Sequence, residues 1–302
     1  MCRLFALHAG AERVAATFWL VDAADSLSAQ SHRNPDGAGI GVFTPDGTPV
    51  VDKQPLAAWQ DDEFASAART LRSSTFVAHV RYASTGARTL ANTHPFTECR
   101  RVFAHNGVLA DLPSIDARLR ARGAGHLVHG DTDSERLFAM ITAETARCGG
   151  DVTAGLTAAV AWVIDQVPVY ALNLVMATAT DLWALRYPDT HELYVLERPP
   201  GGTGHGRPLE ARTTRIHARS QHLVSRPAVV VASEPMDDDP GWRLLDPGEL
   251  LHVDAALRLT STGPFRSTPR HLLRRSDLTP DAEASQHPQH PGLPTHRGPV
   301  RR

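Results

Sequence analysis

Cys2 is the first residue of the chain that could carry out covalent chemistry. Initiator methionine is commonly removed before a small side chain, and Cys2 would then carry both a thiol and a free α-amine. An α-amine titrates near pH ~8 and a thiol near ~8.5, so the amine could act as the base that activates the thiol. A cysteine here could equally pack at the start of a buried strand, and position alone does not separate the two interpretations.

Arg81 and Asp133 are candidates for binding a charged small molecule. Arg81 belongs to the stretch HVRYASTG at the end of an expected strand, where the hydroxyls of Ser84 and Thr85 follow. Its guanidinium is a planar fork that suits a carboxylate. Asp133 belongs to GDTDSE, which opens an expected helix whose dipole favours an ionised carboxylate that could pair with an ammonium group. Taken singly, a surface salt bridge and ordinary helix capping explain the same residues.

Two further polar stretches, NTHPF and AHNG, add a rigid loop and hydrogen-bond donors. Pro95 fixes the backbone after His94, and His94 alone fits a scaffold role better than a catalytic one. Asn106 offers a side-chain N–H and Gly107 lets a backbone N–H approach a ligand, so the two could hold an oxyanion. Asn-Gly is also a strong hairpin signal, and taken alone it predicts a turn here.

Together these residues supply each part that hydrolysis of a side-chain amide of an amino acid would need. Cys2 would attack the amide carbon, its own amine would move the proton, and Asn106 with Gly107 would hold the oxyanion. Arg81 would bind the α-carboxylate and Asp133 the α-ammonium group. The joint set therefore predicts a cysteine amidohydrolase that recognises both charges of a zwitterion.

The elements that must position these residues are strands, then a helical pair, then strands again. Helical periodicity predicts helices over residues 12–21, 61–71, 131–147 and 153–164. Strands are expected over residues 2–8, 40–43, 50–51, 75–82, 101–104, 172–179, 182–187, 192–196, 228–232 and 250–253. This order predicts an α+β architecture of two antiparallel sheets with helices outside.

Composition excludes several other classes of protein. A chain of 302 residues with a formal net charge of −2 carries no electrostatic footprint for nucleic acid or an anionic membrane. No apolar run reaches the ~20 residues that span a bilayer, and the first 30 residues lack a secretory pattern. Cys2, Cys99 and Cys148 are odd in number and widely spaced, which fits a reducing cytoplasm. We expect a cytoplasmic protein with no cofactor or metal.

In their order along the chain, the motifs Met-Cys-Arg, HVRYASTG, NTHPF, AHNG and GDTDSE resemble the class II (N-terminal nucleophile) glutamine amidotransferases. The later stretches ALNL (171–174) and VASEP (231–235) are similar to stand-alone members, which include the γ-glutamyl amidohydrolase of ergothioneine biosynthesis. The resemblance covers roughly residues 2–255.

The resemblance implies a four-layer αββα sandwich of the Ntn hydrolase type, with Cys2 as the mature nucleophile. It also implies that Arg81 and Asp133 bind the α-groups of glutamine or of a γ-glutamyl compound, and that Asn106 and Gly107 form the oxyanion hole. Three further residues would contact the substrate or shape its site: Ser84, Thr85 and His94.

The resemblance leaves the fate of the amide nitrogen open. The protein could hydrolyse a γ-glutamyl amide outright, deliver ammonia to a separate synthase subunit, or bind a γ-glutamyl metabolite without consuming it. A peptidase or acylase on the same fold is disfavoured, because Arg81 and Asp133 would select a free amino acid end.

Composition divides the chain into a catalytic domain over residues 2–262 and a tail over residues 263–302. The tail is rich in Pro, His and Arg, and we expect it to be disordered. Its histidines, interrupted by prolines, indicate a solvated segment rather than a metal site: His271, His287, His290 and His296.

Overall fold

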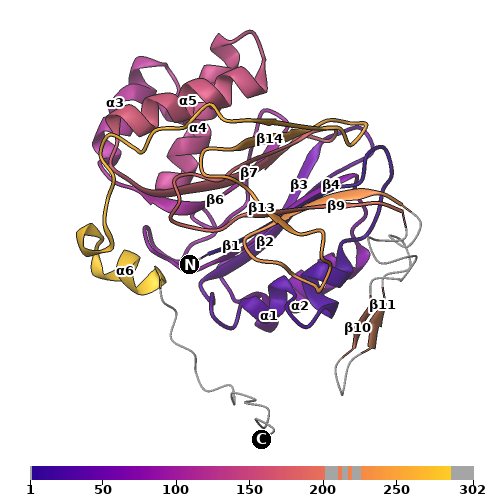
Figure 1. Ribbon diagram of the computed structural model, residues 1–302. Helices are drawn as coiled ribbons and strands as arrows, with labels where there is room; N and C mark the ends of the chain where they lie inside the picture. The colour runs from indigo at the N-terminus through magenta and orange to yellow at the C-terminus, as the bar shows by residue number, and fades with distance from the viewer. Residues whose placement is uncertain (1, 201–209, 213–216, 220–225, 287–302) are drawn as a thin grey trace, which may run out of the picture.

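The computed structural model describes residues 2–200, 210–212, 217–219 and 226–286. Two antiparallel sheets lie face to face between two groups of helices (Figure 1). The expected four-layer α+β architecture is confirmed.

The first sheet has the strand order β13-β9-β12-β1-β4-β2-β3. Its strands are β1 (Arg3–His8), β2 (Gly37–Phe43), β3 (Pro49–Gln54), β4 (Thr75–Arg81), β9 (Tyr194–Arg198), β12 (Ala228–Ala232) and β13 (Arg243–Leu244). The central pair β1 and β4 is antiparallel, with Arg3 opposite Val80, so the start of β1 lies beside the end of β4.

The second sheet has the order β15-β14-β8-β7-β6-β5. Its strands are β5 (Phe96–Glu98), β6 (Arg101–Leu109), β7 (Val169–Ala177), β8 (Leu182–Leu185), β14 (Leu250–Val253) and β15 (Leu259–Thr262). A separate two-stranded pair joins β10 (Glu210–Arg212) to β11 (His217–Arg219).

The helices divide between the two outer faces (Figure 1). The first sheet is covered by α1 (Leu27–Gln30), α2 (Asp62–Thr70), the π-helical turn η1 (Phe18–Asp22) and the 3-10 turn η2 (Ala58–Gln60). The second sheet is covered by α3 (Leu112–Ala121), α4 (Asp133–Arg147), α5 (Val152–Gln166) and the 3-10 turn η3 (Gly125–Leu127). In the part of the chain that is described, no helix has the length and apolar character needed to cross a membrane.

Three apolar clusters fill the spaces between the four layers. On β1, Phe5 and Leu7 face the helices of the first sheet, whereas Leu4 and Ala6 face the second sheet. The same alternation holds on β6, where Val102 and Ala104 face inward. Because strand side chains alternate between faces, even-numbered residues of β1 and β6 lie between the sheets.

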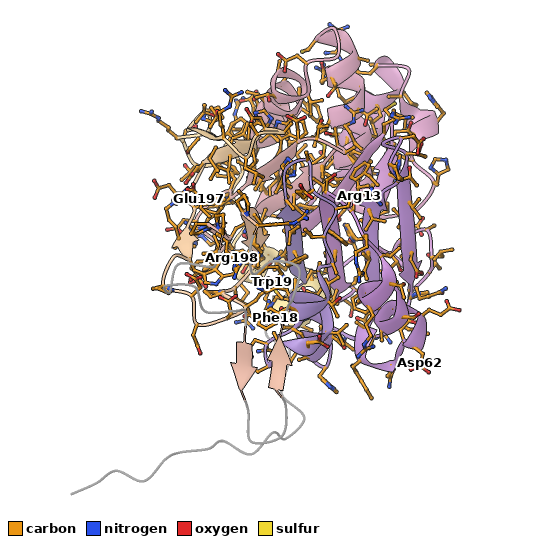
Figure 2. The ribbon with its side chains drawn as sticks, turned by 90° about the vertical axis from the view of Figure 1, so that its right-hand side faces the viewer. Arg13, Phe18, Trp19, Asp62, Glu197 and Arg198 are labelled. Atoms are coloured by element: carbon orange, nitrogen blue, oxygen red, sulfur yellow. The ribbon has the colours of Figure 1, made fainter. Side chains whose placement is uncertain are left out.

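The first predicted helix, over residues 12–21, is wrong in its first half. Val14 instead forms an isolated antiparallel bridge with Ser73, with backbone hydrogen bonds of 2.9 and 3.1 Å. Only residues 18–22 coil, as η1, where Phe18 and Trp19 are buried in the first core (Figure 2). Long-range pairing therefore overrides a short local periodicity.

The segment after β15 also differs from the disorder expected of it. Residues 263–286 run back along the second sheet, where Leu273 donates its N–H to Val169 O at 2.9 Å. They include the 3-10 turn η4 (Arg275–Asp277) and end in α6 (Pro280–Gln286), where Gln286 contacts His191 at 2.9 Å. Composition did not predict these contacts, because it averages over a polar stretch. Two single apolar residues in that stretch, Phe265 and Ala282, are buried and hold it in place. Residues 287–302 lie outside the described part.

Candidate active site

Cys2 lies at the start of β1, on the face of the first sheet that meets the second. Its thiol donates to Tyr82 O at 3.4 Å, and Tyr82 N–H donates to Cys2 Sγ at 3.3 Å. The side chain is half-buried, and burial raises the pKa of the Cys2 thiol. The thiol is therefore held in its neutral form, and attack on a carbonyl would need a base.

Arg81 is the last residue of β4 and is 3% exposed. Its guanidinium donates to the carbonyl oxygens of Thr85 at 2.7 Å, Gly86 at 3.2 Å and Ala87 at 3.1 Å. The arginine therefore organises the loop that follows its own strand, and Ser84 lies half-buried in that loop.

Asp133 is the first residue of α4 and is 2% exposed. Its carboxylate accepts from Thr85 Oγ1 at 3.2 Å, from Ser134 N–H at 2.9 Å and from Leu109 N–H at 2.9 Å. Thr85 thus connects the Arg81 loop to Asp133. Arg81 and Asp133, the two charges expected to bind the ends of a zwitterion, therefore both bond to Thr85. Thr132 caps the helix that carries Asp133, because its Oγ1 accepts from Glu135 N–H at 3.2 Å.

Asn106 and Gly107 do not form the turn that their dipeptide predicts on its own. They lie inside β6, where Asn106 pairs with Asn173 and Gly107 with Leu172 of β7. A Cβ on Gly107 would lie 1.9 Å from Ala171 O, so the close approach of β7 requires glycine here. Asn106 is 4% exposed and shares the inward face with Ala104.

These residues come together because β1 and β4 contact β6 across the inner core. Cys2, Arg81 and Asn106 occupy inward positions of these three strands, and Asp133 reaches the end of β6 through Leu109 N–H. The structure therefore groups the predicted nucleophile, charge-binding pair and oxyanion donor at one end of the sandwich.

His94 is more deeply buried than we would expect of a residue that contacts a substrate. It is 4% exposed, and its ring contacts the tilted ring of His79 at 4.2 Å and meets Phe96 edge to face at 4.6 Å between ring centroids. Burial lowers the pKa of His94 well below its usual range and that of His79 to about 3. His105 is also buried and bonds Ser134 Oγ at 2.9 Å. His105 lies on the helix side of β6, whereas the neutral rings of His79 and His94 pack against each other, which favours the scaffold interpretation of His94.

Two buried residues outside the predicted set hold the site loops. Asp36 accepts from Ala83 N–H at 2.8 Å and pairs with Arg88 at 2.9 Å. Asn92 donates to Ala87 O at 3.1 Å and accepts from Asp131 N–H at 2.8 Å. Asn92 belongs to the NTHPF motif, so the sequence contained a signal for it. Asp36 had a weaker signal, because it stands only in a Pro-Asp-Gly turn sequence.

The strand that carries Cys2 is anchored by Ser233 and Glu234. Leu4 N–H donates to Ser233 Oγ at 2.9 Å, and Ser233 N–H donates to Leu4 O at 3.1 Å. Glu234 pairs with Arg3 at 3.3 Å. The VASEP stretch therefore fixes the first residues of β1, next to Cys2. In the described part of the chain, no group of His, Cys, Asp or Glu side chains has the arrangement of a metal site.

The chain is similar to several known proteins. A family profile described as "Glutamine amidotransferases class-II" matches residues 1–273. The chain is 32% identical to the γ-glutamyl-hercynylcysteine sulfoxide hydrolase of Mycobacterium tuberculosis, over 80% of this chain and 88% of that protein. It is 29% identical to an uncharacterised protein of Methanocaldococcus jannaschii, over 75% of this chain and 64% of that protein's length.

Among solved structures, the glutamine phosphoribosylpyrophosphate amidotransferase of Bacillus subtilis matches with a TM-score of 0.59 at 18% identity. The match covers 90% of this chain and 51% of that one. At this identity the likeness concerns the fold alone, and it assigns the four-layer sandwich to the Ntn type.

Proposed function

Because this chain belongs to the class II glutamine amidotransferases, we propose that it is an amidohydrolase that cleaves the γ-amide of a γ-glutamyl compound or of glutamine, with Cys2 as nucleophile. The observation that carries the proposal is the link through Thr85, which joins the Arg81 loop to Asp133 beside the Cys2 strand. That arrangement offers a cation and an anion for the two ends of an amino acid.

In the proposed reaction, loss of Met1 frees the α-amine of Cys2. The amine takes the thiol proton as Sγ attacks the γ-carbonyl carbon, and Asn106 with Gly107 N–H binds the developing oxyanion. The C–N bond then breaks, and the proton passes to the departing amine or ammonia. Water attacks the γ-glutamyl thioester, so glutamate leaves and the thiol is restored.

The raised pKa of the Cys2 thiol supports the need for a base in this scheme. A half-buried neutral thiol is a poor nucleophile, and the freed amine is the base nearest to it in the covalent structure. Charge selection is supported by the burial of Arg81 and Asp133, because two nearly fully buried charges are little screened by water.

A γ-glutamyl compound is the preferred substrate class. A relative named as a hydrolase of such a compound is 32% identical over 88% of its length. We place the reaction in the cytoplasm, since the three cysteines of the chain are all free.

The test is to incubate the purified full chain with a panel of γ-glutamyl amides and with glutamine, and to follow glutamate by mass spectrometry. We expect glutamate from wild type, none from Cys2→Ala, and an intact mass that lacks Met1. Turnover by Cys2→Ala, or full activity with Met1 retained, would overturn the proposal.

The same experiment separates the alternatives. Rapid turnover of glutamine alone would favour a subunit that supplies ammonia to a synthase. Saturable binding of γ-glutamyl compounds by wild type without any glutamate would favour a silent metabolite-binding protein.

A further inference from the structure

A pocket of about 1170 Å³ lies at the end of the sandwich opposite Cys2. Its walls come from the β2–β3, β5–β6 and β7–β8 turns and from the facing ends of α4 and α5. Arg101, which opens β6, lines this pocket, whereas Asn106 of the same strand belongs to the candidate active site. Five residues of extended strand separate the two by about 17 Å, so the pocket is a distinct place in the molecule.

Arg101 is the most informative residue of the pocket. It is 4% exposed, and its Nη2 donates to Thr142 Oγ1 at 3.3 Å. The guanidinium also bonds the thiol of Cys99, whereas its Nε has no hydrogen-bond partner in the described part of the chain. Burial lowers the pKa of Arg101, but a guanidinium stays charged at neutral pH. Burying a charge costs free energy unless an opposite charge compensates it, so an anion bound at Arg101 would be stabilised.

Two more arginines line the same pocket, and both donate to neutral oxygens. Arg100 donates to Asp46 O at 2.5 Å, and Arg13 donates to Phe43 O at 2.8 Å. Arg100 follows Cys99 in a turn in which both residues have positive φ, at 59° and 48°. Within the described residues, none of these three arginines forms an ion pair with a carboxylate.

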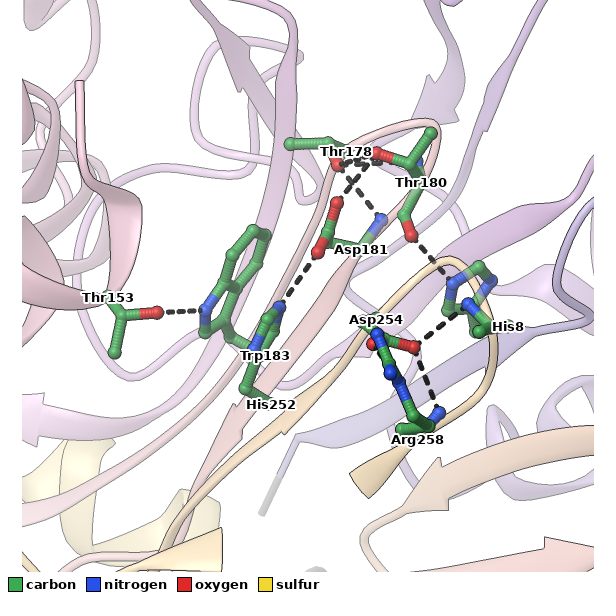
Figure 3. A network of polar contacts seen from close by, with 10 residues as sticks. His8, Thr153, Thr178, Thr180, Asp181, Trp183, His252, Asp254 and Arg258 are labelled. Carbon is green, nitrogen blue, oxygen red and sulfur yellow. Dashed lines mark hydrogen bonds and ion pairs between the residues drawn. The ribbon is translucent and has the colours of Figure 1, made fainter. Parts of the chain in front are cut away.

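The acidic residues that line the pocket are each bound to other groups. The Asp46 carboxylate accepts from Thr44 Oγ1 and from Thr48 Oγ1, both at 2.5 Å, and these hydrogen bonds, with a smaller effect of the nearby Arg100 charge, lower the pKa of Asp46. Asp181 accepts from His252 at 2.8 Å and from Thr180 Oγ1 at 2.6 Å (Figure 3). Asp151 caps α5 by accepting from Ala154 N–H at 2.9 Å. The carboxylates are therefore occupied and the guanidinium groups have unused donors.

Another part of the pocket wall is aromatic and fixed. The His252 ring stacks on Trp183 at 4.8 Å and 11°, and Trp183 Nε1 donates to Thr153 Oγ1 at 2.9 Å (Figure 3). The bond from His252 to Asp181 holds the imidazole in this plane. Such a planar surface suits the organic body of a small molecule.

We propose that this pocket binds a small metabolite through a phosphate or carboxylate group, held by Arg101 and Arg100, with its organic part against His252. Arginine forks bind both kinds of oxyanion in bidentate fashion. The site is independent of the reaction at Cys2 and does not rest on the proposed function.

The three cysteines give a built-in test. Cys99 lines the pocket, Cys148 is exposed outside its lining, and Cys2 reports on the active site. The full chain is alkylated with neutral iodoacetamide in the presence of inorganic phosphate, of citrate, or of chloride at equal ionic strength. Peptide mass spectrometry then gives the rate at each cysteine.

We expect phosphate or citrate to slow alkylation of Cys99 saturably, with no change at Cys148 or Cys2, and the more effective anion identifies the ligand's charged group. Arg101→Gln should raise the apparent Kd roughly tenfold or more. Arg100→Gln should raise it as well, and because Arg100 is exposed this variant does not depend on core stability.

Arg69→Gln is the matched control, since exposed Arg69 on α2 also donates to a backbone carbonyl, Ala65 O at 3.2 Å, and to no carboxylate among the described residues. Equal Cys99 rates in phosphate, citrate and chloride would overturn the proposal. Protection that persists unchanged in both Arg101→Gln and Arg100→Gln would overturn it too.

Discussion

The Cys2 thiol and the Tyr82 backbone hold each other at the junction of β1 and β4, through contacts of 3.3 Å and 3.4 Å in opposite directions. This reciprocal pair fixes the sulfur next to Arg81, the residue before Tyr82. It also means that the thiol proton is bound to a carbonyl until a base removes it.

Cys2→Ser should therefore fold like wild type and lose turnover. A serine hydroxyl can keep both backbone contacts, but it is a much weaker nucleophile than a thiol at neutral pH. Thermal unfolding should give an unchanged Tm, and glutamate release should fall to background. A serine variant with wild-type kcat would contradict the assignment of sulfur as the attacking atom.

Asn106→Ala should lower kcat with little effect on stability. Loss of one oxyanion donor costs about 2.7–4 kcal/mol in the barrier, or roughly 10²–10³-fold. Asn173 of β7, directly opposite, is the control, because its side chain bonds the backbone at His191, Glu192 and Tyr187. Asn173→Ala should instead lower the free energy of unfolding. If Asn106→Ala lost stability and kept kcat, Asn106 would be a structural residue.

Arg81→Lys should weaken substrate binding and loosen the loop that follows β4. A lysine cannot reproduce a fork that reaches three carbonyl oxygens, and each charged hydrogen bond contributes about 1.5–3 kcal/mol. We expect kcat/KM to fall mainly through KM, and hydrogen exchange at residues 85–87 to rise. Arg88→Lys, where an exposed guanidinium makes a single ion pair with buried Asp36, should change kcat/KM little, because a lysine can keep a single ion pair. Equal effects of the two substitutions would argue against a special role for Arg81.

Gly107→Ala should destabilise the second sheet. The added Cβ would meet Ala171 O at 1.9 Å, and relief would require β6 and β7 to separate, at a cost of about 1–3 kcal/mol or more. Gly125→Ala is the control, because its nearest heavy atom would be Arg120 Cγ at 3.8 Å. Urea unfolding should show a lower midpoint for the first variant alone. A Gly107→Ala protein as stable as Gly125→Ala would show that β7 can shift freely.

Stability should decline as pH falls below about 6.5, because buried histidines are neutral in the folded state. Burial lowers the pKa of His79 to about 3 and that of His191 to about 4. Their unfolded forms take up protons below pH ~6.5, so each removes about 1.4 kcal/mol per pH unit from there toward its folded pKa. Urea titrations between pH 7 and 5 should show this slope. His191→Gln should reduce it, and a flat profile in wild type would mean that these rings are solvated.

The layered α+β architecture was readable from the sequence, which also named the candidate site residues. Local periodicity predicted α4 and α5 within two residues at each end, and the strand over residues 228–232 matches β12. Apolar spacing and helix caps act over a few residues, so a linear pattern contains them. The chemical types at Cys2, Arg81 and Asp133 likewise needed no coordinates to indicate amide chemistry on a zwitterion.

Only the tertiary structure decided how residues far apart in the chain are used. Asn106-Gly107 became the interior of β6 because β7 supplies partners along that strand, which outweighs the local preference for a turn. Residue 14 paired with residue 73 rather than coiling, and the segment after residue 262 found contacts on the second sheet. The burial of the Arg101 guanidinium, with no carboxylate ion pair among the described residues, was equally invisible in the sequence, because burial and ion pairing are properties of the packed layers and not of the residue.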